Sequence, residues 1–201
     1  MTGRPKPIRG PWLRYYQPQT CGRGVVERFA ADQYALHYSA QVAEFYPHQL
    51  ALFDNEGLRA CLGFRAASDG PLFLEQYLHT PVERAIGARL GPALARSQIV
   101  EVGGLAADWA GAGRRLIVMA IVWLHGAGYN VAAFTATRGL VNSFVRLGLS
   151  PLDLGSADPA RLAPSATDWG RYYAHGPRVY AGLIGESAAQ TMPALRQAHA
   201  C

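Results

Sequence analysis

IVEVGGLAADWAGAGRRLIVMAIVWLHGAGYNVAAFTATRGLVNSFVRLGL, residues 99–149, is the stretch of this sequence that decides the fold. Its pattern predicts a strand at 98–105, an apolar helix at 114–125, a second strand at 131–137 and a short helix at 140–147. The turn 109–115 joins the first strand to the first helix. Free backbone N–H groups and the helix dipole make such a turn an anion site. We therefore expect the turn to bind phosphate through Gly111, Gly113, Arg114 and Arg115.

The segments on either side complete the expected fold. They predict a helix at 27–46, strands at 49–53 and 58–66 joined by the hairpin turn 54–57, a short apolar piece at 72–78, a helix at 81–94, and strands beginning at 151 and 179. This order is typical of the α+β class, with a mixed sheet whose central β-α-β-α-β segment is flanked by helices. Parallel neighbours in such a sheet leave a ligand cleft at their carboxyl ends.

We expect one domain at 25–185 with a terminal segment on each side. Residues 1–24 are rich in Pro, Gly and Arg and show no periodic core pattern, which predicts a flexible basic arm outside the core. Residues 186–201 form a weakly patterned C-terminal tail.

Charge and cysteine content limit the function classes. Residues 1–28 hold six basic residues and one acid, so this end carries the whole net charge of +5 while the rest is balanced. Nucleic-acid binders usually cluster bases on the folded domain, so we do not expect a nucleic-acid partner. The three cysteines form no CxxC pair, which favours a reduced, cytoplasmic protein. No signal peptide is visible, and the longest apolar run, 116–124, is too short for the roughly twenty residues of a membrane span.

Three resemblances follow from these residues. The segment Asp108-Trp-Ala-Gly111-Ala-Gly113-Arg114 resembles the Gln/Arg-x-x-Gly-x-Gly/Ala motif of the GCN5-related N-acyltransferase fold, with Asp108 where that motif has Gln or Arg. Most of residues 25–185 resembles the thermostable haemolysin family, in the blocks LGFRAA (62–67), LFLEQYL (72–78), IVEVGGLA (99–106), FTAT (134–137) and RLGL (146–149). The element order is also similar to that of acyl-homoserine-lactone synthases, whose Trp-Glu-Leu-Ser-Arg-Phe strand matches Glu101 but has Arg where Gly104 stands.

These resemblances imply an acyltransferase with an acetyltransferase-like fold. It would move an acyl group, possibly a fatty one, from the phosphopantetheine thioester of acyl-CoA or of an acyl carrier protein to a small amine, with no permanently bound cofactor. Two alternatives stay open: a cytolytic, membrane-acting protein, as the family name suggests, and an inactive binding module on the same fold. The sequence shows neither a long basic amphipathic helix nor pore-forming strands.

Acyl transfer to an amine needs a base and donors for the developing oxyanion. Glu101 is the first catalytic candidate, because a carboxyl group in an apolar strand has a raised pKa; its structural alternative is a salt bridge with Arg65. Glu75 is the second, and its alternative is the solvated face of a half-buried strand. Gln76 and Tyr77 beside it are candidates for acceptor binding.

The end of the second parallel strand supplies the remaining candidates. Thr135 and Thr137 are expected to bind substrate, although threonine is also an ordinary strand residue. The resemblance places Asn142 against the pantetheine arm; a surface position is equally compatible with the sequence. The six histidines show no HExxH spacing, so we expect no metal site, and the chain has no GxSxG nucleophile elbow. Trp169-Gly-Arg-Tyr-Tyr173 is a candidate wall of an acyl tunnel or a packing cluster.

Overall fold

The computed structural model describes residues 10–91, 94–165 and 167–198. The strands are β1 (Trp12–Tyr16), β2 (His48–Asp54), β3 (Gly57–Ala66), β4 (Ile99–Ala107), β5 (Val131–Ala136), β6 (Leu152–Ser156) and β7 (Arg178–Leu183). The helices are α1 (Arg23–Tyr38), α2 (Val82–Leu90), α3 (Ala110–Gly126), α4 (Arg138–Arg146) and α5 (Ile184–Ala198). Short 3-10 turns add Ala67–Asp69, Phe73–Tyr77, Arg96–Gln98, Pro159–Arg161 and Tyr172–His175.

The strands form one seven-stranded sheet in the order β1-β2-β3-β4-β5-β7-β6. Only β4 and β5 run parallel, and the other neighbouring pairs are antiparallel. The expected α+β class with a mixed sheet around a central β-α-β-α-β segment is therefore confirmed.

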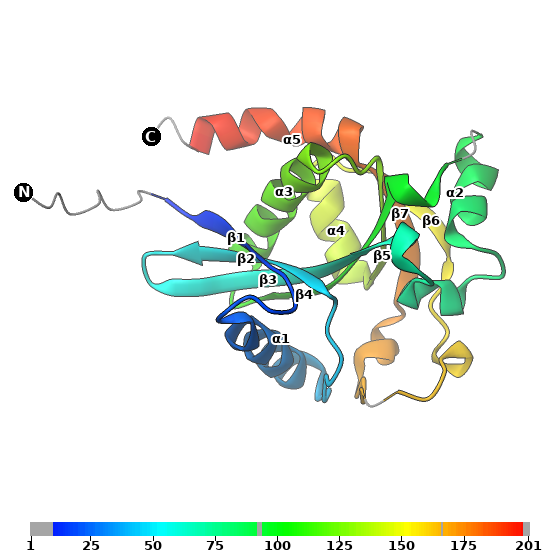
Figure 1. Cartoon of the computed structure of the whole chain (residues 1–201), viewed down its shortest axis with the longest axis horizontal. Helices are drawn as coiled ribbons and strands as arrows, with labels where there is room; N and C mark the ends of the chain where they lie inside the picture. Colours follow the sequence, from blue (N-terminus) through cyan, green and yellow to red (C-terminus); the bar gives the residue numbers. More distant parts are fainter. Residues whose placement is uncertain (1–9, 92–93, 166, 199–201) are drawn as a thin grey trace, which may run out of the picture.

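Helices cover both faces of the sheet, with α1 on one side and α3, α4 and α5 on the other (Figure 1). The period of two in β2 explains this division. Leu50 and Leu52 belong to the core cluster that contains α3, whereas Ala51 packs with Val26 and Ala30 of α1. A further cluster joins α2 and the turn Phe73–Tyr77 to β4, β5 and β7.

Both ends of the sequence are more ordered than their composition suggests. Strand β1 lies inside the segment expected to be an arm and pairs along its whole length with β2. Tyr16 is buried, and Trp12 stacks on Phe53 with ring centroids 6.0 Å apart. Helix α5 occupies most of the expected tail and packs against α3, with Ala188 and Thr191 buried. Apolar residues without a long periodic pattern are enough to form a strand or a helix when a neighbouring sheet edge or helix face is available to pack against. Residues 1–9 of the expected arm lie outside the described part of the chain.

Several element boundaries differ from the expectation. Helix α3 begins at Ala110, so Gly111, Gly113 and Arg114 lie in its first turns and not in a preceding loop. Helix α2 ends at Leu90, where Gly91 has a φ of 88°. Within the apolar piece 72–78, Phe73–Tyr77 forms a 3-10 turn, and Glu75 in this turn accepts hydrogen bonds from the backbone N–H groups of Leu72 and Val82.

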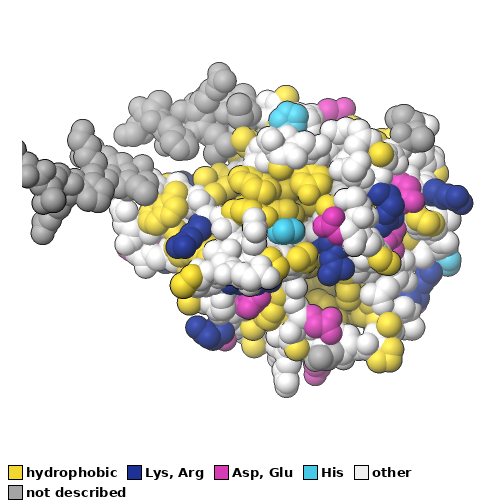
Figure 2. Space-filling model, in the orientation of Figure 1, with side chains coloured by type: hydrophobic (Ala, Val, Ile, Leu, Met, Phe, Trp, Pro, Cys, Tyr) yellow, Lys and Arg dark blue, Asp and Glu magenta, His cyan; other side chains and the backbone are white. Residues whose placement is uncertain are grey.

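Hydrophobic side chains also gather on the surface over α3 and its neighbouring strands, in the face shown by Figure 2. Leu13, Tyr15, Met119 and Trp123 are partly buried and pack against the α3 core cluster. On the same face, basic and acidic side chains are interspersed.

Candidate functional site

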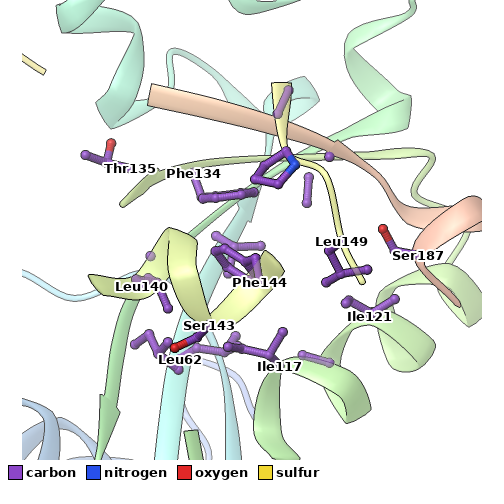
Figure 3. A pocket seen from close by; sticks show the side chains of 18 of the residues that line it. Leu62, Ile117, Ile121, Phe134, Thr135, Leu140, Ser143, Phe144, Leu149 and Ser187 are labelled. Atoms are coloured by element: carbon purple, nitrogen blue, oxygen red, sulfur yellow. The ribbon is translucent and has the colours of Figure 1, made fainter. Parts of the chain in front are cut away.

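A cavity of about 940 Å³ lies on the face of the sheet covered by α3, α4 and α5. Its walls are mostly apolar, with Ile117 and Ile121 of α3, Leu140 and Phe144 of α4, and Phe134 of β5 (Figure 3). Phe144 faces Phe134 with ring centroids 4.9 Å apart. The cavity is large enough for a drug-sized or cofactor-sized ligand.

The cavity opens between β4 and β5 because these strands stop pairing. Their parallel register ends at Val102↔Phe134, although β4 continues to Ala107. The register of β4 with β3 also shifts here, from Gly63↔Gly103 to Cys61↔Ala106. Gly104 lies in this irregularity with a φ of 60°, a left-handed conformation that glycine adopts without strain. Gly103, Gly104 and Leu105 consequently line the cavity.

The first turns of α3 border one part of the cavity. Ala110, Gly113 and Arg114 line this cavity. The Arg115 side chain is exposed, and Gly111 does not line the cavity. The Trp109 ring lies against Gly111, where an added Cβ would be 1.5 Å from a ring carbon. Of the four residues expected to bind phosphate, the structure brings two to the cavity.

Asp108, at the motif position where an acyltransferase has Gln or Arg, is paired. Its carboxylate accepts a hydrogen bond from Nη1 of Arg59 at 2.9 Å, and Arg59 also binds Asp54 at 2.8 Å. The arginine offsets a negative charge that would otherwise repel an anion at the start of α3.

A second, smaller cavity of about 80 Å³ lies on the α1 side of the sheet. Eight of the eighteen residues that line it are aromatic. The two cavities meet through the gap between β4 and β5, and six residues line both: Tyr34, Leu62, Gly103, Gly104, Thr135 and Tyr172. The two cavities therefore adjoin at these residues.

Tyr46 lies flat on the sheet beside this junction. An added Cβ would be 2.6 Å from the Tyr46 Cβ at Gly63 and 2.4 Å from the Tyr46 hydroxyl at Gly103. The two glycines face each other across β3 and β4, so the ring needs both. Burial, followed by the nearby charge of Glu101, raises the pKa of Tyr46 well above its usual value.

Glu101 lies behind Tyr46, only 2% exposed, and lines neither cavity. Its carboxylate accepts hydrogen bonds from the backbone N–H groups of Phe73 and Leu74, both at 2.8 Å, and one from the Tyr46 hydroxyl. Burial raises the pKa of Glu101 to about 7, against the lowering effect of these hydrogen bonds. This carboxyl group therefore changes protonation near neutral pH and reaches the smaller cavity through the Tyr46 hydroxyl.

The other carboxylate candidate, Glu75, binds groups that lie away from the two cavities. Glu75 binds Arg96 at 2.7 Å and the backbone N–H groups of Leu72 and Val82, and it lines neither cavity. Gln76 likewise bonds to the backbone of Phe73 and Ala163 and lines neither cavity.

Three of the remaining candidates line a cavity. Tyr77 lines the smaller one, with its hydroxyl 2.5 Å from that of Tyr173, and Thr135 lies at the junction of the two. Thr137 lines the larger cavity and hydrogen-bonds to Tyr38. Asn142 is exposed and lines neither, whereas its neighbour Ser143 lines the larger cavity.

Sequence reasoning missed Tyr46 and Gln49 of the smaller cavity, and it left Trp169 undecided between a tunnel wall and packing. The loop before β2 carries Tyr46, β2 itself carries Gln49, and the loop before β7 carries Trp169. No motif links the three in the sequence. Gly63 and Gly103 were the available signal, because glycines in the middle of strands indicate a close approach by another group.

The described residues contain neither a candidate metal site nor a helix suited to span a membrane. Within the described residues, no group of three or more His, Cys, Asp or Glu side chains is placed to hold a metal ion. No helix in this part of the chain is both long and apolar enough to cross a membrane.

Comparison with known proteins identifies the family and the fold. The family model described as thermostable hemolysin matches residues 16–188. No curated protein matches the chain. Among solved structures, the chain is similar to the AHL synthase LasI, with 10% identity, a TM-score of 0.58, and coverage of 87% of this chain and 90% of that one.

Two further structures have the same arrangement. FeeM, an N-acyl amino acid synthase from uncultured soil microbes, has 15% identity and a TM-score of 0.59 over 92% of this chain and 97% of that one. MesI, a CoA-dependent acyl-homoserine lactone synthase, has 12% identity and a TM-score of 0.53 over 91% and 94%. At such identities the likeness establishes the shared fold.

Proposed function

The chain belongs to the thermostable hemolysin family, and we propose that it is an N-acyltransferase. It would move an acyl group from a phosphopantetheine thioester, carried by coenzyme A or by an acyl carrier protein, to a small amine. The observation that carries this proposal is the meeting of the two cavities at Gly103, Gly104 and Thr135. A donor and an acceptor that enter from opposite faces of the sheet would come into contact there.

The larger cavity suits the donor. Its apolar wall suits an acyl chain, and the first turn of α3 with Arg114 offers N–H groups and a positive charge for phosphate. MesI is named a CoA-dependent acyl-homoserine lactone synthase and FeeM an N-acyl amino acid synthase, which agrees with a thioester donor.

The junction suits the reacting carbonyl group. Backbone N–H groups at Gly103, Gly104 and Leu105, where β4 has left β5, would donate to the oxygen on which negative charge develops. The Thr135 hydroxyl, at the same junction, would donate to the departing sulfur.

Tyr46 and Glu101 would remove the proton from the amine. The amine nitrogen bonds to the thioester carbon and gives a proton to the Tyr46 oxygen, while the Tyr46 proton moves to the Glu101 carboxylate. The carbon–sulfur bond breaks, and the thiolate leaves and takes up a proton from solvent, to which Glu101 returns the proton that it received. A carboxyl group with a pKa of about 7 is suited to exchange protons at neutral pH.

The test is to incubate the pure protein with acyl-CoA and acyl carrier protein donors of increasing chain length and a panel of small amines. We expect thiol release together with an amide that mass spectrometry identifies, and the two donor types distinguish the two carriers. Absence of amide product from every donor would contradict the proposal, as would lysis of liposomes by the pure protein without any donor.

A further inference from the structure

The smaller cavity contains two buried polar atoms that have no partner in the described structure. Oε1 of Gln49 and Nε1 of Trp169 are buried without a hydrogen bond, and both residues line this cavity. Gln49 as a whole is only 4% exposed. A buried polar atom without a partner is destabilising, so a bound ligand is the natural source of a partner for each of them.

The two atoms need different hydrogen-bond partners. The amide oxygen of Gln49 is an acceptor and needs an N–H or O–H group, whereas the indole N–H of Trp169 is a donor and needs an oxygen. A ligand that satisfies both has a donor at one end and an oxygen acceptor at the other.

The surrounding backbone holds both side chains in position. Gln49 lies on β2 between two strands, paired with Tyr16 on β1 and Gly63 on β3. Trp169 follows Asp168, whose backbone N–H and C=O bond to Gln41 at 3.1 and 2.7 Å. Gly170 has a φ of 51°, and an added Cβ would be 2.4 Å from the Tyr38 carbonyl oxygen, so the loop is tied closely to the end of α1.

The charge of the cavity favours a cation. Glu44 lines it, Glu101 lies behind Tyr46, and its lining within the described residues contains no Lys, Arg or His. Faces of Phe73, Trp169 and Tyr172 add the negative potential of aromatic rings, which attracts ammonium groups. A carboxylate in the cavity would meet the like charge of the Glu44 side chain, whereas an ammonium group would be attracted by it.

We propose that the acceptor is a small amine with an uncharged oxygen function, such as an amino alcohol, and that Gln49 and Trp169 select it. The ammonium group binds Gln49 and the aromatic wall, and the Trp169 N–H donates to the oxygen. A cavity of about 80 Å³ holds only a few non-hydrogen atoms. The assignment rests on the proposed acyl transfer for its chemical step, and on the two unpartnered atoms for its ligand.

Three amines of similar size test the proposal: 2-aminoethanol, propylamine, which lacks the oxygen, and glycine, whose oxygen function is charged. Binding to the full chain is measured by ligand-observed NMR, and amide formation is measured separately with thioester donors. We expect 2-aminoethanol to bind at least about tenfold more tightly than the other two, on the scale of one buried hydrogen bond.

Variants then assign the selection to residues. Trp169→Phe removes the N–H and should make 2-aminoethanol and propylamine bind alike. Gln49→Met should weaken both amines equally, and Gln49→Glu should restore their binding. Trp123→Phe is the matched control, since Trp123 packs against Tyr15 and Phe64 away from both cavities, and it should leave the ratio unchanged.

The outcomes separate this inference from the proposed function. Glycine binding as tightly as 2-aminoethanol, or an unchanged ratio in folded Trp169→Phe protein, would overturn the acceptor class. Amide formation with glycine as the better substrate would also overturn it while supporting acyl transfer. The expected binding order without amide formation from any donor would support the acceptor class and contradict the proposed reaction.

Discussion

At the scale of single residues, Glu101 shows how burial and hydrogen bonding act against each other on one carboxyl group. Two backbone N–H groups and the Tyr46 hydroxyl favour the ionised form, and burial disfavours it more strongly. The result is a pKa of about 7 in place of the usual 4.5. At physiological pH, Glu101 is therefore protonated in part of the protein population, whereas an exposed glutamate is ionised in nearly all of it.

The first prediction concerns pH and activity. If Glu101 must be ionised to accept the Tyr46 proton, the rate at saturating substrate should fall about tenfold per pH unit below 7. Glu101→Gln should lose 10²–10⁴-fold in rate, and Tyr46→Phe should lose a comparable amount, because each removes one end of the proton path. Both are measured by amide formation in proteins that circular dichroism shows to be folded. Normal turnover in folded Glu101→Gln would assign Glu101 to structure alone.

The second prediction concerns pH and stability. The folded state holds the Glu101 proton more tightly than the unfolded state, so its contribution is complete below pH 4.5 and is lost as pH rises through 7. A difference of 2.5 between these pKa values corresponds to about 3 kcal/mol. The free energy of unfolding, measured with urea at pH 4 and pH 8, should therefore lose this part of its pH dependence in Glu101→Gln and keep it in the unsubstituted protein. An identical pH dependence in the two proteins would contradict the raised pKa.

The third prediction concerns the glycines beneath Tyr46. Gly103→Ala would place a methyl group 2.4 Å from the Tyr46 hydroxyl, and such overpacking typically costs about 1–3 kcal/mol. In a Tyr46→Ala background the same substitution meets no ring, so its cost should largely vanish in a double-mutant cycle. Equal costs in both backgrounds, measured by chemical denaturation, would show that the ring does not lie on Gly103.

At the scale of elements, the first turns of α3 separate two arginines that are adjacent in the sequence. Successive helical residues point about 100° apart, so adjacent side chains need not face the same cavity. Arg114 lines the larger cavity and Arg115 points to solvent.

The fourth prediction follows from this difference. Arg114→Ala should weaken coenzyme A binding by about 1–3 kcal/mol, the range of a charge-assisted hydrogen bond to phosphate. Arg115→Ala has the same change of charge and size and should have a much smaller effect, screened by salt. Calorimetric titration measures both, and equal losses would mean that the phosphates do not lie beside the cavity face of α3.

At the scale of the whole molecule, the sheet begins with β1, the strand that covers the outer edge of β2. Without β1, the backbone N–H and C=O groups of β2 would lose their partners, and Tyr16 would no longer fill its place beside Val26 and Ala51. An uncovered edge is also a template for aggregation.

The fifth prediction concerns this edge. Deletion of residues 1–17 removes β1 and a fully packed tyrosine, and the loss of one large aromatic alone costs about 3–5 kcal/mol. We expect the melting temperature to fall by roughly 10 °C or more, since about 1 kcal/mol shifts it by 2–4 °C in a domain of this size. An unchanged melting temperature by calorimetry would show that β1 adds nothing to stability.

The sequence determined the fold class and the position of the larger cavity, because both follow from local patterns. Hydrophobic periodicity defined the β4-α3-β5-α4 order, and glycines before a helix indicated the open N-terminus of α3. It also indicated Glu101, since a charged residue within an apolar strand stands out along the chain.

Tertiary structure alone decided what surrounds these features. β1 and α5 are ordered by edges and faces that distant residues supply, so their own residues carry little signal. Glu75 and Gln76 stand beside Tyr77 in the sequence, yet only Tyr77 lines a cavity, since the 3-10 turn sends neighbouring side chains in different directions. The smaller cavity joins Tyr46, Gln49 and Trp169 from three segments, and such an encounter depends on chain packing that no local pattern records.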